Sequence, residues 1–517
     1  MEIAMGIYDA PQIQQQPTLY LNPFKSNIAV FGGPMTGKTT FIKAYLVRIH
    51  EKRELAAREN IYIIDFGGNM GEYSRLESIC ACFDNANEEN IKRIFKTLER
   101  RMDENAKELE SNNYYSLYIK DPARCPSHLT LIIENLNAFL SDERYAAYQE
   151  RLIRLCRDGL SKGLSVIVTA NDITGTNRLM ANFGQKVAFE MPSDNYFEIF
   201  NTKVSKPMKL PGRGIVNIDS ATYEFQCFVP FIGNEETELR TLISECSSVK
   251  NKNKMAAFNG NLTVNNVSKF SENALSISKK DDILVGLDYY EHKPVCVNVK
   301  ESRSIAIYGK RQFGKSNLLR IIVQAILRAN RGVRFVYLDD GRKQLEEFQG
   351  AGSDNVYLTN VESFRDYLTE HGYGGKRSVR TAKATVPPQP ISNDTPYTVF
   401  VLQSKALYQS SLDATYLMRD WIPEMIGNAD VRNYLFIFSD VRNISAPEVR
   451  IPFNNSISVA FVLDNIGEFV AGKGSNSVLG EMDSRELKAE YAKCSVGDGY
   501  YYDVEADVLE KLRFIKS

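Results

Sequence analysis

The chain has 517 residues, enough for about three ordinary domains or for two large α/β units. Hydrophobic residues make up 43% of it and charged residues 25%, a composition that excludes a collagen, a coiled coil or a disordered tail. Lys and Arg number 63 against 64 Asp and Glu, so the net charge of −1 argues against a polycation that holds DNA through its overall charge.

The first residues, Met1–Gly6, include an acid and no long apolar region, so they do not form a secretory signal. Nowhere does an apolar run approach the roughly 18 residues that a membrane-spanning helix requires. The eight cysteines include no C-x-x-C pair and only four histidines are present, which argues against a disulfide framework or a structural zinc site. We therefore expect a reduced, cytoplasmic chain.

An apolar strand at 28–31 runs directly into a glycine-rich loop and a helical segment. The loop fits the P-loop pattern G-x-x-x-x-G-K-[ST] and consists of Gly32, Gly33, Pro34, Met35, Thr36, Gly37, Lys38, Thr39 and Thr40. In this context, backbone N–H groups and the helix N-terminus cradle phosphates. We expect Lys38 to reach the β- and γ-phosphates of ATP and Thr39 to hold Mg²⁺.

Two later strands end in acidic residues. The first ends in Asp65, which either assists the metal or orders its own glycine-containing loop. The second ends in Glu134 and Asn135, where P-loop ATPases usually carry a metal-binding Asp and a general base. Glu134 can ligate Mg²⁺ but Asn135 cannot accept a proton, so we expect weak hydrolysis at this site, with Glu134 and Asp65 as its candidate catalytic residues.

Three further polar residues have two possible roles each. Asn171, which follows a strand ending in Thr169-Ala170, either contacts the γ-phosphate or caps its own loop. Arg157 and Arg213 are candidates for an arginine supplied in trans, although a surface salt bridge is the simpler interpretation of each.

Between these motifs, apolar strands alternate with helical patterns. One stripe at helical spacing indicates a helix that packs on a core, and its residues are Ile91, Ile94, Phe95, Leu98 and Met102. Such alternation predicts a mainly parallel sheet with helices on both faces.

The whole series occurs twice, since Lys315 follows Lys38 by 277 residues and later landmarks keep nearly that offset. The second P-loop consists of Gly309, Lys310, Arg311, Gln312, Phe313, Gly314, Lys315, Ser316 and Asn317, with Ser316 in the Mg²⁺ position. We therefore predict an α/β chain of two tandem P-loop NTPase domains of the RecA/FtsK-like type, at 1–246 and 283–517, joined by a polar linker at 247–282, with a surface hairpin as the alternative for the joining segment.

The second copy is degenerate at the strand that should hold the metal. Its strand ends in Gln403 and Ser404, with no carboxylate, and chain order favours this strand over the later one that precedes Asp440. Asp339 or Asp340 takes the place of the first copy's Asp65. We expect this site to bind ATP without splitting it. An exposed loop insertion is predicted at 373–396.

The order of these motifs resembles the FtsK/SpoIIIE-type P-loop ATPases. More narrowly, the lead-in Gly6-Ile7-Tyr8-Asp9, the sequence Asp65-Phe66-Gly67-Gly68 and the sequence Pro211-Gly212-Arg213-Gly214 resemble the C-terminal tandem ATPase domains of the EssC/EccC type VII secretion family. Gly497-Asp498-Gly499 departs from the last of these in the second copy.

The resemblance implies an ATP- and Mg²⁺-binding part of a protein secretion motor, which regulates the motor or recognises small helical WXG-type substrates. It implies as partners the membrane-anchored remainder of the ATPase and other components of the secretion complex, at the inner face of the cell membrane, and a hexamer as the candidate homo-oligomer. An FtsK-like DNA translocase and a non-hydrolysing ATP-binding scaffold are the alternatives, and the near-zero net charge disfavours nucleic acid as a partner.

Overall fold

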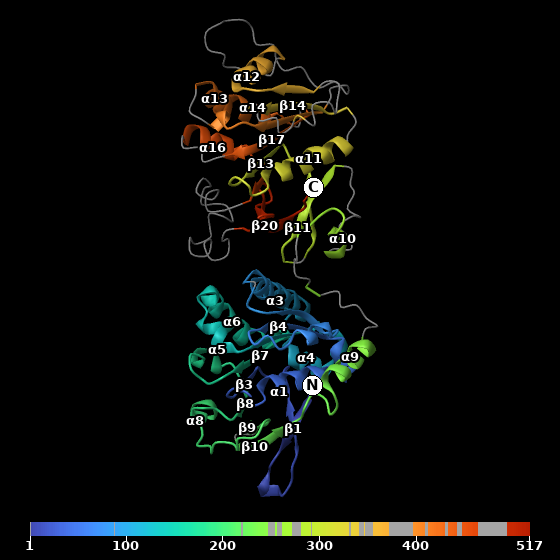
Figure 1. The fold of residues 1–517 in the computed structure, drawn as a ribbon, viewed down its shortest axis with the longest axis vertical. Coiled ribbons are helices and arrows are strands. Elements are labelled where there is room, and N and C mark those ends of the chain that lie inside the picture. The colour runs from blue at the N-terminus through green and yellow to red at the C-terminus, as the bar shows by residue number, and fades with distance from the viewer. Residues whose placement is uncertain are drawn as a thin grey trace. The chain divides into compact units, whose positions relative to one another are not determined.

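The structure, a computed structural model, consists of two compact units, Met1–Ala257 and Phe258–Ser517 (Figure 1). The residues that it describes are 2–86, 88–218, 221–246, 254–255, 261–270, 281–290, 292–329, 332–340, 346, 355–371, 397–408, 412–429, 433–441, 447–463 and 494–516. The insertion predicted at 373–396 and most of the linker predicted at 247–282 lie outside these residues.

The first unit contains a ten-stranded sheet in the order β2-β1-β10-β9-β8-β3-β7-β6-β4-β5. Its strands are β1 (Ile3–Tyr8), β2 (Thr18–Leu21), β3 (Ile28–Phe31), β4 (Glu59–Asp65), β5 (Ile79–Phe83), β6 (His128–Glu134), β7 (Leu164–Ala170), β8 (Gln185–Phe189), β9 (Arg213–Ile218) and β10 (Ala221–Cys227). The strands from β8 to β5 are parallel, and the strands from β2 to β9 extend the sheet antiparallel.

The second unit repeats this sheet strand for strand, in the order β12-β11-β20-β19-β18-β13-β17-β16-β14-β15. Its strands are β11 (Asp282–Asp288), β12 (Pro294–Asn298), β13 (Ser304–Tyr308), β14 (Arg334–Asp339), β15 (Val356–Leu358), β16 (Thr398–Gln403), β17 (Tyr434–Val441), β18 (Val459–Val462), β19 (Asp498–Asp503) and β20 (Val508–Phe514). The fold class predicted from the sequence, two tandem P-loop domains with mainly parallel sheets, is thereby confirmed.

Helices cover both faces of each sheet, as the buried strand patterns predict (Figure 1). In the first unit the main helices are α1 (Lys38–His50), α3 (Glu88–Leu109), α4 (Tyr114–Lys120), α5 (Leu136–Ser141), α6 (Ala146–Asp158), α8 (Tyr196–Phe200) and α9 (Glu235–Cys246). In the second unit they are α11 (Lys315–Ala329), α12 (Val361–Glu370), α13 (Leu412–Tyr416), α14 (Ile422–Gly427) and α16 (Pro447–Asn455).

Successive strand residues point to opposite cores. On β4, Tyr62 and Ile64 join α3, α5 and α6 in one cluster, whereas Ile61 and Ile63 join α1, α4 and α9 in the other. The stripe predicted to be a core-facing helix is α3, and its five residues are at most 2% exposed. The parallel strands are therefore buried on both faces, which accounts for their almost continuous apolar sequences.

The antiparallel extension depends on one glycine in each unit. Gly6 lies where β1 bulges against β2 and approaches β10, and a Cβ added there would stand 2.3 Å from the backbone oxygen of Gln226. Gly286 of β11 has the same bulge, with a Cβ position 2.4 Å from the oxygen of Arg513. A larger residue at either position would collide with the backbone of the neighbouring strand. The close approach of the two strands therefore requires glycine in each lead-in.

Among the described residues, no helix is both long and apolar enough to span a membrane.

Candidate functional site

The first P-loop joins β3 to α1 in a strained conformation that a nucleotide-binding loop requires. Met35 has φ of 60° and Gly37 has φ of 115°, and α1 begins immediately afterwards at Lys38. The ammonium of Lys38 donates to the backbone oxygens of Gly32 and of Gly33, the latter at 2.8 Å. The lysine side chain thus folds back onto the loop around which bound phosphates would lie.

The second P-loop, between β13 and α11, shares most of this geometry. Gln312 and Gly314 have φ of 72° and 100°, as Met35 and Gly37 have positive φ in the first loop, whereas Gly309, with φ of 146°, differs from Gly32. Lys315 donates to the backbone oxygens of Gly309 and Lys310 at 2.7 and 2.8 Å, as Lys38 does to Gly32 and Gly33. These shared features support the assignment of the two motifs as a repeat.

In the first unit, the P-loop helix and the end of β6 meet at a carboxylate. Thr39 Oγ1 donates a hydrogen bond to Glu134 Oε1, and Glu134 is 4% exposed. Burial, then the adjacent Asp65, raises the pKa of Glu134 to about 7, although Thr39 and Lys43 act in the opposite direction. The pKa of Lys38 is lowered by burial, which the charge of Glu134 opposes.

These groups fit a magnesium–nucleotide pair. Glu134 Oε2 is buried and has no hydrogen-bond partner among the described residues, so the carboxylate retains a free acceptor beside the Thr39 hydroxyl. Hydroxyl and carboxylate oxygens are ligands that Mg²⁺ prefers. The predicted metal residues of the first site therefore lie together.

Asp65 lies beside Glu134, because β4 and β6 are in register at these two residues. Its oxygens, however, accept hydrogen bonds from the backbone N–H groups of Gly67, Gly68 and Met70, at 3.1, 2.8 and 2.7 Å. Of the two roles predicted for Asp65, the geometry favours ordering its own loop.

Asn135 cannot act as a base and is also occupied as a helix cap. Its side-chain oxygen accepts from the N–H of Ala138 at the start of α5, and its own N–H donates to Thr169 Oγ1 at 2.8 Å. Asn171 is exposed and donates its backbone N–H to Asn137 Oδ1 at 2.8 Å. Capping accounts for Asn135, whereas at Asn171 the loop is bonded through its backbone by the side chain of Asn137.

The second unit aligns β16 with β6, so Gln403 occupies the place of Glu134. Beside it, Asp339 accepts a hydrogen bond from the hydroxyl of Tyr357 at 2.7 Å. Asp340 accepts from the N–H of Lys405 at 2.6 Å and from the hydroxyl of Ser404. This site offers Ser316 but no carboxylate on β16, and so fits a metal less well than the first.

The two arginines considered for action in trans form local ion pairs. Arg157 pairs with Asp158 at 2.7 Å. Arg213 pairs with Asp9 at 2.7 Å and with Glu224 at 3.0 Å, so the lead-in and the Pro-Gly-Arg-Gly sequence are structural partners. The turn also supports the P-loop, because the N–H of Gly212 donates to the backbone oxygen of Thr36 at 2.9 Å.

The second unit has a different ion pair on the corresponding strands. Asp498 stands at the position of Arg213 and forms an ion pair with Arg513, its partner in the register of β19 and β20. The departure from Gly-Arg-Gly noted in the sequence is therefore compensated across the strand pair.

The sequence did not reveal a cluster one turn beyond the first P-loop. Lys43 on α1 forms an ion pair with Glu235 of α9 at 2.7 Å, and the hydroxyl of Tyr73 donates to the same Glu235 oxygen at 3.0 Å. The three residues come from distant segments, and the only sequence signal was a lysine four residues after Thr39.

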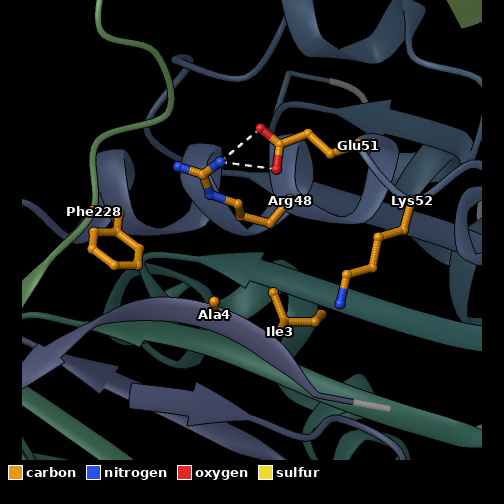
Figure 2. A pocket seen from close by; sticks show the side chains of 6 residues that line it. All are labelled: Ile3, Ala4, Arg48, Glu51, Lys52 and Phe228. Atoms are coloured by element: carbon orange, nitrogen blue, oxygen red, sulfur yellow. Dashed lines mark hydrogen bonds and ion pairs between the residues drawn. The ribbon is translucent and has the colours of Figure 1, made fainter. Parts of the chain in front are cut away.

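A hollow of about 310 Å³ lies at the other end of α1, away from the P-loop (Figure 2). Ile3, Ala4 and Phe228 give it apolar walls, and both oxygens of Glu51 bind the guanidinium of Arg48, at 2.6 and 2.8 Å. The other cation of the hollow, Lys52, donates to the backbone oxygen of Glu2 at 3.2 Å.

Fold and site together define the chain as a pair of P-loop ATPase-type domains. No family model matches the chain. It is similar to EccC of Geobacillus thermodenitrificans, with 23% identity over 62% of this chain and 22% of that protein, and to EssC of Staphylococcus aureus strain MRSA252, with 20% identity over 74% and 27%. The chain thus spans about a quarter of the length of these curated relatives.

Solved structures show the same fold. ATPases 2 and 3 of EssC from Geobacillus thermodenitrificans align with a TM-score of 0.70 and 18% identity, over 100% of this chain and 96% of that one. ATPases 2 and 3 of Thermomonospora curvata EccC, in complex with a signal sequence peptide, align with a TM-score of 0.61 and 17% identity, over 100% and 93%. The predicted resemblance to the EssC/EccC tandem ATPase domains is confirmed.

Proposed function

We propose that the chain is the tandem ATPase module of a type VII protein secretion motor and that it binds ATP with Mg²⁺ at both P-loops. The observation that carries this proposal is the repeated strand–loop–helix cradle in two matching sheets, in a chain similar along its length to ATPases 2 and 3 of EssC. We retain domain limits of 1–246 and 283–517 with a linker at 247–282 as part of it.

In the first site the proposal assigns phosphate binding to residues 32–40 and metal binding to Thr39 and Glu134. When bound, Mg²⁺ would neutralise phosphate charge. Lys38 would exchange its bonds to the loop's own backbone oxygens for phosphate oxygens, which places a positive charge where negative charge gathers. In the second site residues 309–317 would bind phosphate, with Ser316 as the metal residue.

Hydrolysis is proposed to be weak at the first site and absent at the second. Asn135, next to Glu134, is held as a helix cap and has no basic atom, so no strong base adjoins the first site on β6. Asp65 is committed to its loop. Gln403 leaves β16 without the carboxylate that phosphoryl transfer uses.

The partners proposed are small helical secreted substrates of the WXG type, the membrane-anchored remainder of the ATPase and other secretion components. A similar protein, Thermomonospora curvata EccC, was solved in complex with a signal sequence peptide, which supports substrate recognition as a task of such modules. We place the chain on the cytoplasmic side of the cell membrane and propose a hexamer as its working assembly.

Calorimetry with ATP and Mg²⁺ tests the proposal, alongside steady-state ATPase assays. We expect two binding sites, with Lys38→Ala and Lys315→Ala each removing one, and slow turnover that Lys38→Ala abolishes. The matched control is Lys52→Ala, a lysine two residues beyond the last residue of α1. Absence of binding at both loops would refute the proposal.

A non-hydrolysing ATP-binding scaffold is the second candidate, favoured by Gln403 and by the cap role of Asn135. Two sites with no measurable turnover would establish it in place of a weak ATPase.

A further inference from the structure

The cluster of Lys43, Tyr73 and Glu235 lies where three separate segments of the first unit converge. Lys43 lies over the ring of Tyr73, 5.4 Å from its centroid, and both groups bind one oxygen of Glu235. Burial of Tyr73 and the charge of Glu235 raise the pKa of the phenol, so it remains a donor. Lys43 is 20% exposed and Glu235 46%, so the pair contributes little stability and its position matters more.

One connection runs from the cluster to the nucleotide site along α1. Thr39 and Lys43 are one helical turn apart, so they lie on the same face of α1. Thr39 binds Glu134, and Lys43 binds Glu235. One face of α1 therefore binds both carboxylates.

A second connection runs through the loop after β4. Asp65, beside Glu134, accepts from the N–H of Met70, and the N–H of Tyr73 donates to the backbone oxygen of Met70 at 3.0 Å. Tyr73 then reaches Glu235 through its hydroxyl. The P-loop helix α1 and the loop after β4 both flank the first site. Each of them therefore binds the carboxylate of Glu235, through Lys43 and Tyr73 respectively.

Glu235 is the first residue of α9, the last helix described in the first unit. Leu239 anchors the helix to the core beside α1, and the chain continues from Cys246 into the segment that joins the two units. The first turn of α9 is consequently bonded to residues connected to the nucleotide site, and its last residue precedes the joining segment in the sequence.

We propose that Lys43 and Tyr73 are positioning residues that couple occupancy of the first nucleotide site to the docking of α9 through Glu235. The inference rests on the proposed function, because it requires a nucleotide at the first P-loop. Binding that fixes α1 and the β4 loop would fix both partners of Glu235 and so strengthen the docking of α9. By reciprocity, loss of the α9 contact weakens nucleotide binding by the same factor.

The test uses the full chain with Lys315→Ala, so that only the first site responds. Affinity for a non-hydrolysable ATP analogue with Mg²⁺ is measured by calorimetry, and amide hydrogen exchange of α9 is measured with and without the analogue. We expect the analogue to slow exchange in α9. Lys43→Met and Glu235→Gln should each remove that slowing and lower the affinity about fivefold, at the lower end of usual coupling factors.

Three comparisons decide whether the contact itself is responsible. The double variant should lose no more affinity than the worse single variant, because both remove one interaction. Lys43→Arg should restore the coupling. Arg240→Met breaks an ion pair with Glu236 within α9 alone and should change nothing.

Analogue binding without a response of α9, an effect of Lys43→Met that Glu235→Gln does not share, or additive losses in the double variant would each overturn the inference alone. No analogue binding at the first site would overturn the proposed function and the inference with it.

Discussion

The buried carboxyl of Glu134 should make the stability of the nucleotide-free first unit depend on pH. Its pKa lies at about 7 against an ordinary value of 4.5, chiefly because of burial. The folded state therefore binds a proton that the unfolded state releases between about pH 4.5 and 7, so the free energy of unfolding falls as the pH rises through this window. At 1.36 kcal/mol per pKa unit, the loss reaches about 3 kcal/mol at most, and a share of it belongs to the interaction with Asp65.

Glu134→Gln removes the titrating group but keeps an oxygen that can accept from Thr39. At pH 8 we expect the free energy of unfolding of the variant to exceed that of the natural chain by about 1–3 kcal/mol, so that the variant unfolds at higher urea. At pH 5 the two free energies should differ little. Urea unfolding would be followed without nucleotide, with EDTA present, by circular dichroism at both pH values.

The single tryptophan, Trp421, provides an internal control, because it lies in the second unit and is 7% exposed. Its fluorescence should follow the same unfolding curve in both proteins. An equal gain at pH 5 and pH 8, or a gain that the Trp421 signal shares, would show that the buried charge is not the cause.

Three further substitutions test how the first unit is built. Gly37→Ala introduces a Cβ at φ of 115°, 3.1 Å from a backbone nitrogen of the neighbouring turn, so it should lower the free energy of unfolding by about 1–3 kcal/mol and abolish nucleotide binding in calorimetry. The control Gly71→Ala, whose Cβ would meet nothing within 4 Å, should have neither effect. Arg213→Asp should lower the thermal midpoint by several degrees, and adding Gln226→Arg, which copies the pair of the second unit, should restore part of it. Asn27→Ala leaves three backbone groups, two of them in buried bonds, without the amide that bonds them at 2.8–2.9 Å, and should destabilise the first unit by about 3 kcal/mol in urea unfolding.

The parallel part of each sheet was predictable because each strand is a local apolar run next to a motif. The antiparallel extension was not, since Gly6 pairs with a residue more than 200 positions away and only the pairing explains it. In the sequence, the lead-in and the Pro-Gly-Arg-Gly sequence are two separate features. Opposite charges on Asp9 and Arg213 were the one signal that they belong together.

The P-loops could be predicted from the spacing of their residues, because a few consecutive residues determine their backbone geometry. The role of Asp65 stayed open in the sequence, since an acid at a strand end can face a ligand or its own loop, and backbone direction decides between them. Lys43 and Glu235 are 192 positions apart, and no periodicity links them.

A buried polar cluster at the opposite end of β4 and β6 escaped the sequence analysis entirely. Glu59 lies 3.0 Å from His128 Nδ1, and the hydroxyl of Thr130 donates to Glu59 at 3.0 Å, with all three at most 2% exposed. In the sequence these residues are single polar interruptions of apolar strands. Their mutual contact requires the register of the two strands.

The repeat itself shows what this cluster means for the fold. Counted back from the aligned strand ends, Val333, Tyr397 and Val399 occupy the same places in the second unit. One sheet therefore forms with a buried Glu–His–Thr cluster at this edge and its copy forms without one. Since a buried pair often contributes no more stability than apolar residues of the same size, the polar cluster is not what determines the fold. The two units share their architecture through strand order and the P-loop, and they differ in the charges set within it, at this edge as at Glu134 and Gln403.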